Sequence, residues 1–295
     1  MNKREGAEDL TGIDTSRRPP DALADVQSSA DRRNLPIQRA GIRGLRYPLR
    51  WQLRGEVQHT VMEVALDVGV GAAQRGTHMS RFIALLEEHQ GALNLAQVAV
   101  LHQRMLDRLE AAEGRIDMRF PVFLRKRAPV SGAESCLDYQ VAVRCAGSQH
   151  ARCTDIAVTA PVTSLCPCSR EVADYGAHNQ RAHLTLAVRV HPDCLAKVDP
   201  ERLIDIAEAQ ASSQVYALLK RVDEKVLTER AYDNPKFVED LVRDLAAALV
   251  AIQAAEGILA YCVQAENFES IHNHSAWAEI HSPGWHAPGL PAGSL

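Results

Sequence analysis

A regular change of hydrophobic period along the chain is the feature that most limits how it can fold. Apolar residues alternate with polar ones in Leu45–Leu53 and Met62–Val70, which is typical of strands with one buried face. They then recur at helical spacing in Phe82–Leu86 and Leu95–Leu109. Alternation returns in two further segments, Ile116–Leu124 and Leu137–Val143. The first half of the chain therefore predicts the order strand, strand, helix, helix, strand, strand.

The second half shows the same order of patterns. Strands are predicted at Ile156–Val162 and Leu184–Val190, and helices from Pro200 through Leu218 and from Pro235 through Leu249. The last strands are expected at Ile258–Ala265 and Ala276–His281. The sequence thus predicts an α+β fold of two tandem ββααββ modules, with antiparallel sheets and helices on one face. Open sheet edges are expected to pair between subunits, which favours a homo-oligomer.

Four regions are expected along the chain. Residues 1–40 are polar and charged without periodicity, which is typical of a flexible arm. The first module is expected at residues 41–147, and the second, which carries most of the reactive side chains, at residues 148–282. Residues 283–295 are rich in proline and glycine and predict an irregular tail.

The composition narrows the class of protein. The chain has 295 residues and a formal charge of -4, so it does not predict general binding to nucleic acid, which needs a basic surface. The sequence contains no run of about 18 apolar residues, so it does not predict a membrane span. The charged start lacks the apolar region of a secretory signal. A cytoplasmic protein is therefore expected, in which the seven irregularly spaced cysteines stay reduced.

One stretch, SLCPCSREVADYGAHNQRAH at residues 164–183, concentrates reactive side chains. Cys166 and Cys168 stand two apart, and His178 follows twelve residues after Cys166. A closed zinc site is a weak interpretation, because no second cysteine pair completes four ligands. Two chemical alternatives remain open: a thiolate nucleophile with His178 as its base, or two ligands of a catalytic metal. Two cysteines in an ordinary loop are the third alternative.

Three other segments offer partners for this stretch. Histidines crowd ENFESIHNH at residues 266–274, and carboxylates crowd residues 220–240, although both patterns are also typical of solvated surfaces. In QRGTHMSRF, the side chains of Arg75, His78 and Arg81 flank the start of a predicted helix. Backbone N–H groups at a helix start and two guanidinium groups suit a phosphate, so these three residues are candidate phosphate ligands.

Together these segments resemble a known family. The signature segments of type IB GTP cyclohydrolases are similar, in order, to QRGTHMSRF, SLCPCSREVADYGAHNQR, LKRVDEK, TERAYDNPKFVEDLVRD and ENFESIHNH. The resemblance covers residues 40–282 and implies a tunnelling fold (T-fold) and a homotetramer with active sites at the subunit interfaces. It also implies the first step of folate and pterin synthesis, in which GTP and water give formate and 7,8-dihydroneopterin triphosphate.

The resemblance also assigns roles to individual residues. It implies that Cys166 and His178 are catalytic and that the divalent-metal ligands are Cys166, His178, Glu224 and His272, with His274 as the alternative to His272. It implies that Glu239 binds the guanine edge, whose N–H donors a carboxylate can accept. Zinc, manganese and iron all suit such mixed ligands. The implied chemistry is attack of a metal-activated water on C8 of guanine.

Two rival functions fit parts of the pattern. A T-fold nitrile reductase would use Cys166 as a covalent nucleophile with NADPH and without a metal. A metal-storing protein would explain Cys166 and the histidines, but it leaves Glu239 and the cluster of Arg75, His78 and Arg81 without a purpose. GTP is therefore the expected substrate, and Arg75, His78 and Arg81 are candidate ligands of its triphosphate. Neither nucleic acid nor a membrane is expected as a partner.

Overall fold

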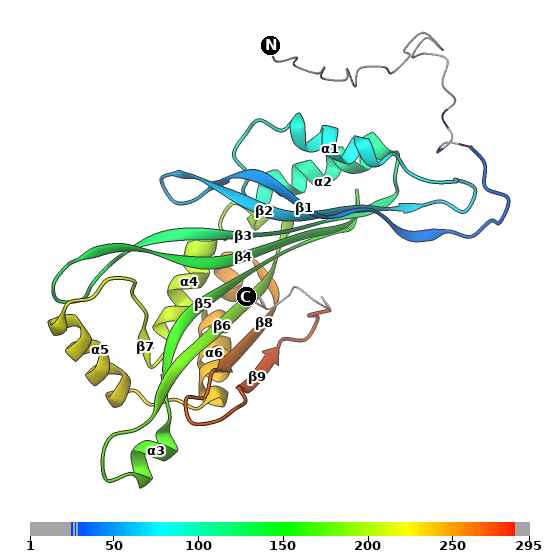
Figure 1. The fold of residues 1–295 in the computed structure, drawn as a ribbon. Helices are drawn as coiled ribbons and strands as arrows, with labels where there is room; N and C mark the ends of the chain where they lie inside the picture. The colour runs from blue at the N-terminus through cyan, green and yellow to red at the C-terminus, as the bar shows by residue number, and fades with distance from the viewer. Residues whose placement is uncertain (1–24, 26, 28, 287–295) are drawn as a thin grey trace, which may run out of the picture.

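A single, mostly antiparallel nine-stranded sheet runs through the described part of the molecule in this computed structural model, which describes residues 25, 27 and 29–286 (Figure 1). The strands follow the order β1-β2-β3-β4-β5-β6-β8-β9, and the short β7 pairs with β5. Their bounds are β1 (Ile37–Gln52), β2 (Val57–Val70), β3 (Glu113–Arg127), β4 (Glu134–Ser148), β5 (Arg152–Leu165), β6 (Asn179–Val190), β7 (Ser213–Gln214), β8 (Ile258–Asn267) and β9 (Ala276–His281).

Six helices accompany the sheet within the described residues. They are α1 (Met79–Glu87), α2 (Leu95–Leu109), α3 (Pro167–Val172), α4 (Pro200–Ala209), α5 (Arg221–Asp233) and α6 (Val238–Glu256), with a single 3-10 turn, η3 (Pro192–Cys194). α4 begins as its sequence predicts, because the Asp199 side chain accepts a hydrogen bond from Arg202 N and Pro200 occupies the first turn.

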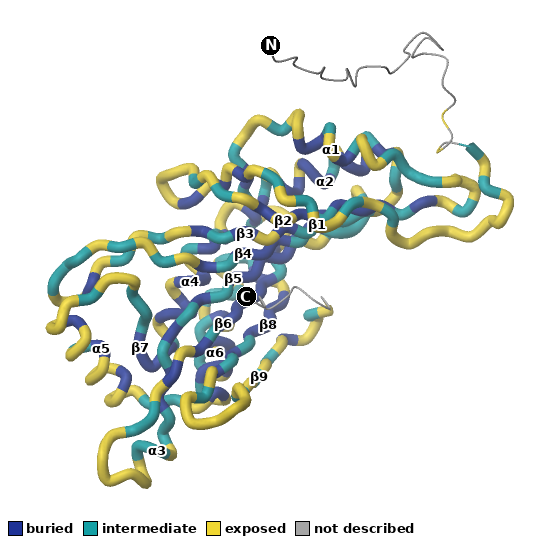
Figure 2. The backbone as a smooth tube through the Cα atoms, in the orientation of Figure 1, coloured by how far each residue is buried: buried dark blue, intermediate teal, exposed yellow. Residues whose placement is uncertain are grey.

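One apolar row shows which face of the sheet these helices cover. Register partners Val64, Met118, Val143, Ile156 and Val188 cross β2 to β6, and all are buried in one core. α1 and α2 pack on this face over β1, β3 and β4, and α4 and α6 pack on it over β5, β6 and β8. Figure 2 shows the buried backbone gathered where the strands cross the middle of the molecule. The two halves of the chain therefore share one hydrophobic core.

The predicted fold class, two tandem ββααββ modules, is wrong. β4 pairs with β5 over eight register pairs, from Gln140↔Thr159 to Gly147↔Arg152, so both halves lie in one continuous sheet. The second half also departs from ββααββ, since α3 lies between β5 and β6, and β7 and α5 lie between α4 and α6. Hydrophobic period marks local elements only, and the pairing of strands from different halves leaves no trace in it.

A buried cluster of polar groups joins the first-half strands to α4. Lys126 Nζ on β3 lies 2.6 Å from Glu208 Oε1 on α4, and the Tyr139 hydroxyl on β4 donates to the same oxygen at 2.5 Å. Lys126 also donates to Val215 O at 2.8 Å and lies 4.3 Å from the centre of the Tyr216 ring. Burial lowers the pKa of Lys126, and Glu208 opposes this shift. The cluster therefore fixes the segment that leads into α5.

A second contact holds the start of α5 against the β3–β4 hairpin. The Asp223 carboxylate is buried and accepts hydrogen bonds of 2.6 to 2.9 Å from Val130 N, Ser131 N, Ser131 Oγ and Lys220 N. Burial alone would raise the pKa of Asp223, but the hydrogen bonds from Ser131 and the backbone outweigh it and lower this pKa. An ionised Asp223 therefore links α5 to the first half of the chain.

The predicted arm and tail fall largely on residues 1–24, 26, 28 and 287–295, which lie outside the described residues. Among the helices of the described segments, none is long and apolar enough to cross a membrane.

Candidate active site

The reactive stretch forms the connection at the end of the β5–β6 hairpin. Leu165 and Asn179 are the last register pair, so Cys166 and His178 lie next to each other where the two strands end. The Cys166 N–H donates to His178 O at 3.2 Å. α3 starts directly after Cys166, because Pro167 favours a first helical turn and Cys166 is the N-cap. This connection lies at the lower end of the molecule in Figure 1.

Ser169 holds the connection closed from both sides. Its N–H donates to Cys166 Sγ at 3.4 Å, and its Oγ donates to Cys166 O at 3.1 Å. The same Oγ accepts a hydrogen bond from the His178 N–H at 3.1 Å. Cys168 is exposed on α3 and is not part of this arrangement. The two cysteines of the motif therefore differ in their contacts, and Cys166 is the one linked to His178 by hydrogen bonds.

The His178 imidazole is oriented by its neighbours. Its Nδ1 lies 3.0 Å from Gln180 Oε1 and 3.9 Å from Glu269 Oε2. The His178 and Glu269 side chains are only 14% and 13% exposed, and Gln180 is buried. Because a carboxamide oxygen only accepts hydrogen bonds, Nδ1 carries the hydrogen, and in the neutral imidazole Nε2 then carries the lone pair. Nε2 is thus the nitrogen available to bind a cation or a proton.

The turn between β8 and β9 brings further donors to this place. Phe268 N donates to Arg181 O at 3.0 Å, which lays the turn along the start of β6. Glu269 follows, and His272 N donates to Glu269 O at 3.4 Å. The rings of His272 and His274 stack with centroids 5.0 Å apart, and both residues are exposed. The predicted ligand His272 therefore stands in the same turn as Glu269.

The two other predicted carboxylates stand on separate helices. Glu224 lies in the first turn of α5 and Glu239 in the first turn of α6, and both are exposed. Among residues 25, 27 and 29–286, no group of three or more His, Cys, Asp or Glu side chains is arranged to hold a metal ion. The described part of one chain thus brings Cys166 and His178 together, but it does not bring Glu224 to them.

The predicted triphosphate ligands lie at the β2–α1 connection. His78 and Arg81 line a pocket of about 270 Å³ there, whereas Arg75 is not among its lining residues. His78 Nε2 lies 2.9 Å from Asp25 Oδ1, and Arg81 donates to Arg108 O at 3.2 Å. β2 and α1 lie in the upper part of Figure 1 and α3 at its lower end. In one chain, this pocket is therefore well separated from Cys166.

A family model and several relatives identify the family of this chain. The model of the type I GTP cyclohydrolase folE2 family matches residues 23–278. This chain belongs to that family. The GTP cyclohydrolase FolE2 of Ralstonia nicotianae is 52% identical over 264 residues, which cover 89% of this chain and 95% of the relative. The GTP cyclohydrolase FolE2 of Neisseria meningitidis serogroup A is 50% identical over 261 residues, which cover 88% of this chain and 85% of the relative.

Two solved structures that are similar to this folE2 family member are distant from it in sequence. The uricase of Arthrobacter globiformis has a TM-score of 0.44 at 10% identity and covers 86% of this chain and 96% of its own. The urate oxidase of Bacillus subtilis 168 has a TM-score of 0.47 at 9% identity and covers 83% and 98%. Likeness at this level says nothing about the activity of this chain.

The donors at the β5–β6 connection suit a divalent metal in kind. The Cys166 thiol and the lone pair on His178 Nε2 are the sulfur and nitrogen donors that zinc and iron accept, whereas the Glu269 carboxylate lies on the Nδ1 side of the imidazole. The fit is partial, because the other two predicted ligands are not gathered around these donors in the described part of the chain. A folE2 family site built from these residues needs donors from elsewhere to be complete.

Three residues of this folE2 family connection were not assigned from the sequence. Ser169 ties Cys166 to His178, Gln180 sets the tautomer of His178, and Glu269 approaches the imidazole. The only available signals were weak: Ser169 stands three residues after the N-cap, and Glu269 lies within the segment ENFESIHNH.

Proposed function

We propose that this chain is a GTP cyclohydrolase I, a hydrolase that converts GTP and water into formate and 7,8-dihydroneopterin triphosphate in folate biosynthesis. The relative from Ralstonia nicotianae, 52% identical over 89% of this chain, is named GTP cyclohydrolase FolE2. The observation that carries the proposal is the closed connection of Cys166, Ser169 and His178. It holds Cys166 and His178 next to each other through Ser169 and the backbone, and the nearly buried Glu269 carboxylate lies 3.9 Å from the His178 imidazole.

The metal ligands in this proposal are Cys166, His178, Glu224 and His272, and the ion is zinc, manganese or iron. When bound, a divalent ion supplies Lewis acidity and lowers the pKa of a water molecule to about 7. Gln180 would support His178 as a ligand, since its oxygen accepts the Nδ1 hydrogen and leaves the Nε2 lone pair available. Cys166 and His178 would be catalytic by holding a divalent ion that activates water for attack on C8 of guanine.

The substrate groups in this proposal come from two other elements. Glu239, in the first turn of α6, accepts hydrogen bonds from the guanine edge. His78 and Arg81, with Arg75 beside them, bind the triphosphate at the start of α1. A guanidinium matches phosphate oxygens in pairs, so this cluster orients the nucleotide while C8 faces Cys166.

The separation of these groups in one chain supports an assembled enzyme. The β2–α1 pocket and the β5–β6 connection lie at different ends of the molecule, so one GTP cannot touch both within a single chain (Figure 1). The proposal therefore includes a cytoplasmic homotetramer in which each active site combines residues of two subunits. The two regions 41–147 and 148–282 then contribute the triphosphate ligands and the metal ligands, respectively.

Turnover of GTP tests the activity directly. Protein reconstituted with zinc, manganese or iron is incubated with GTP, and the product is oxidised and detected by neopterin fluorescence. Cys166→Ala should lower kcat/KM by at least about 100-fold and lose bound metal, since even residues that only support a ligand are worth about 10–100-fold. Cys168→Ala is the matched control and should keep wild-type activity, because Cys168 is exposed on α3.

Absence of product with all three metals would refute the cyclohydrolase assignment. Full activity together with full metal content in Cys166→Ala would refute the site. Consumption of NADPH with a nitrile-bearing deazaguanine, and no product from GTP, would favour the reductase instead.

Mixing of two inactive variants tests the shared site. Cys166→Ala and Arg81→Ala subunits are denatured together and refolded as hybrids. If each site combines residues of two subunits, some hybrid sites contain both intact groups, and activity returns above that of either variant alone. If both groups act within one chain, every site in the mixture is defective and activity stays absent.

A further inference from the structure

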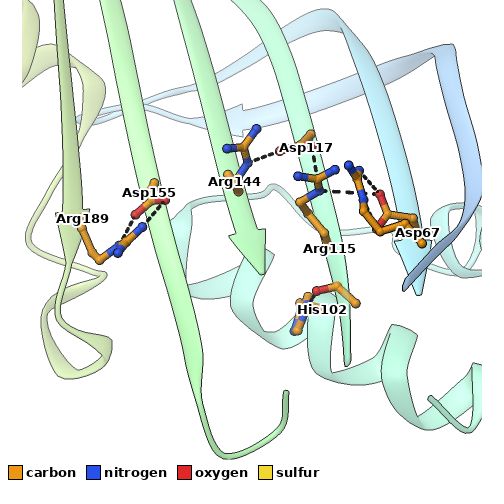
Figure 3. Close-up of polar contacts among 9 residues, drawn as sticks. Asp67, His102, Arg115, Asp117, Arg144, Asp155 and Arg189 are labelled. Carbon is orange, nitrogen blue, oxygen red and sulfur yellow. Dashed lines mark hydrogen bonds and ion pairs between the residues drawn. The ribbon is translucent and has the colours of Figure 1, made fainter. Parts of the chain in front are cut away.

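The face of the sheet opposite the helices carries a row of charged side chains. Register partners Asp117, Arg144, Asp155 and Arg189 cross β3 to β6 (Figure 3). They are next to the buried apolar row along each strand and therefore point to the other face. Asp155 is buried and accepts two hydrogen bonds from Arg189, at 2.8 and 3.1 Å. At this end of the row, arginine and carboxylate are balanced one to one.

The other end of the row opens into a pocket of about 500 Å³ between β1, β2, β3 and β4, here called the arginine pocket. Its charged lining residues are Arg39, Arg43, Arg115, Arg119, Arg144, Glu63 and Asp117. Asp67 adjoins them, because its carboxylate accepts two hydrogen bonds from Arg39. Five guanidinium groups thus face three carboxylates, which leaves two positive charges in excess.

Two aspartates hold three of these arginines in fixed orientations. Arg39 pairs with Asp67, and Arg115 Nε lies 3.1 Å from Asp117 and 3.6 Å from Asp67. Arg144 Nε donates to Asp117 at 2.6 Å (Figure 3). Arg115 Nε is buried and has no well-directed hydrogen bond. Since a guanidinium has five N–H donors, pairing with a carboxylate orients Arg39 and Arg115 without using all of their donors.

Arg43 and Arg119 supply the excess charge of the arginine pocket. Both are exposed, and no ion pair involves either of them within residues 25, 27 and 29–286. Glu63 is the register partner of Arg119 on β2, yet the two do not form an ion pair in the described structure. Two unpaired guanidinium groups therefore stand at the opening of a pocket whose other arginines are already oriented.

We propose that the arginine pocket binds a polyphosphate group, as found in inorganic tripolyphosphate and in nucleoside triphosphates. Guanidinium groups match phosphate oxygens in pairs, and arginines from β1, β3 and β4 surround the pocket, so a ligand with several linked anionic groups engages them together. The volume falls within the range of about 300–1,000 Å³ that is typical of small-molecule sites. This site is separate from the proposed active site, because it shares no residue with the Cys166 connection or with the pocket of His78 and Arg81.

Calorimetric titration of the full-length protein with inorganic tripolyphosphate tests this site. Arg43→Ala/Arg119→Ala should weaken binding by at least about tenfold, because each change removes a charge-assisted contact worth about one factor of ten or more. The variant should fold normally, since both side chains are exposed and unpaired in the described structure. The matched control is Arg125→Ala, which removes an exposed arginine from the same strand outside the pocket and should leave the affinity unchanged.

Parallel measurements separate this site from the substrate site and identify the ligand. A KM for GTP that stays constant in Arg43→Ala/Arg119→Ala while tripolyphosphate affinity falls supports a separate site. A KM that rises together with the loss of tripolyphosphate binding would overturn it, because the arginines would then serve the substrate. ATP, titrated in the same way, shows whether a nucleoside adds affinity. If neither ATP nor tripolyphosphate binds more weakly to the variant, the proposal is wrong.

Discussion

The buried pair of Lys126 on β3 and Glu208 on α4 allows a test of how much a buried charge contributes to the free energy of unfolding. The two side chains are 9% and 8% exposed, and their charged atoms lie 2.6 Å apart. Lys126→Met keeps the length of the side chain but removes the ammonium group. Among the described residues, Glu208 then keeps only the Tyr139 hydroxyl as a donor, and Val215 O loses its hydrogen bond from Lys126. Removal of one partner of a buried pair costs about 3–5 kcal/mol of folding free energy.

Lys225→Met is the matched control for this prediction. Lys225 and Glu229 on α5 also lie 2.6 Å apart, but their side chains are 70% and 56% exposed. A solvent-exposed pair of this kind contributes about 0.3–0.5 kcal/mol. The two variants therefore differ in burial but not in distance. The difference between their losses of folding free energy measures how burial changes the contribution of an ion pair of this length.

Equilibrium unfolding in urea, followed by circular dichroism at one fixed protein concentration, gives the free energy of unfolding for both variants. A third variant, Lys126→Met/Glu208→Gln, should be more stable than Lys126→Met alone, because neutralising Glu208 removes the buried charge that the first change leaves without a partner. Two results would contradict this prediction. Lys126→Met could be destabilised by no more than Lys225→Met, or the double variant could lose as much free energy of unfolding as Lys126→Met and Glu208→Gln lose separately when added together.

Three further predictions follow from single residues. Burial lowers the pKa of His102, so below about pH 6.5 the unfolded chain binds more protons than the folded protein. Stability therefore falls as the pH drops. His102→Gln should reduce this fall, measured as Tm between about pH 7 and 5. Gly257→Ala should lower Tm several degrees more than Gly176→Ala, because both have positive φ but only at Gly257 would a Cβ atom lie 2.4 Å from Cys194 Sγ. Asp223→Ala should release the start of α5, which faster hydrogen exchange in that helix would show.

The long strands were predictable because apolar and polar residues alternate along them. β9 coincides with the predicted Ala276–His281, and β8 extends the predicted Ile258–Ala265 by two residues. Helices with few apolar residues were not predictable from the sequence. Of the residues of α5, only Asp223, Leu227 and Ala231 are buried. An acidic residue and a small one among so many charges give no apolar stripe, so the segment resembles a solvated connection.

At the site, contacts within one hairpin were predictable from the sequence, whereas contacts between distant segments were not. Cys166 and His178 flank one hairpin, so their spacing in the sequence already indicated that they act together. Glu269 reaches His178 only through the pairing of β6 with β8, which brings together residues about ninety positions apart. The ββααββ prediction was wrong for the same reason, since the pairing of β4 with β5 decides whether the halves form one sheet or two.

The short turn between β4 and β5 has a consequence for how this chain can be divided. Ser148 N donates to Ala151 O at 3.1 Å, and the turn interrupts no strand. A chain cut between Gln149 and His150 would give two fragments, each with one exposed edge that is complementary to the other. Arg144 and Asp155 face each other across that seam and favour the correct partner in the correct register. Expressed separately, the fragments should therefore find each other and rebuild the enzyme as a split protein.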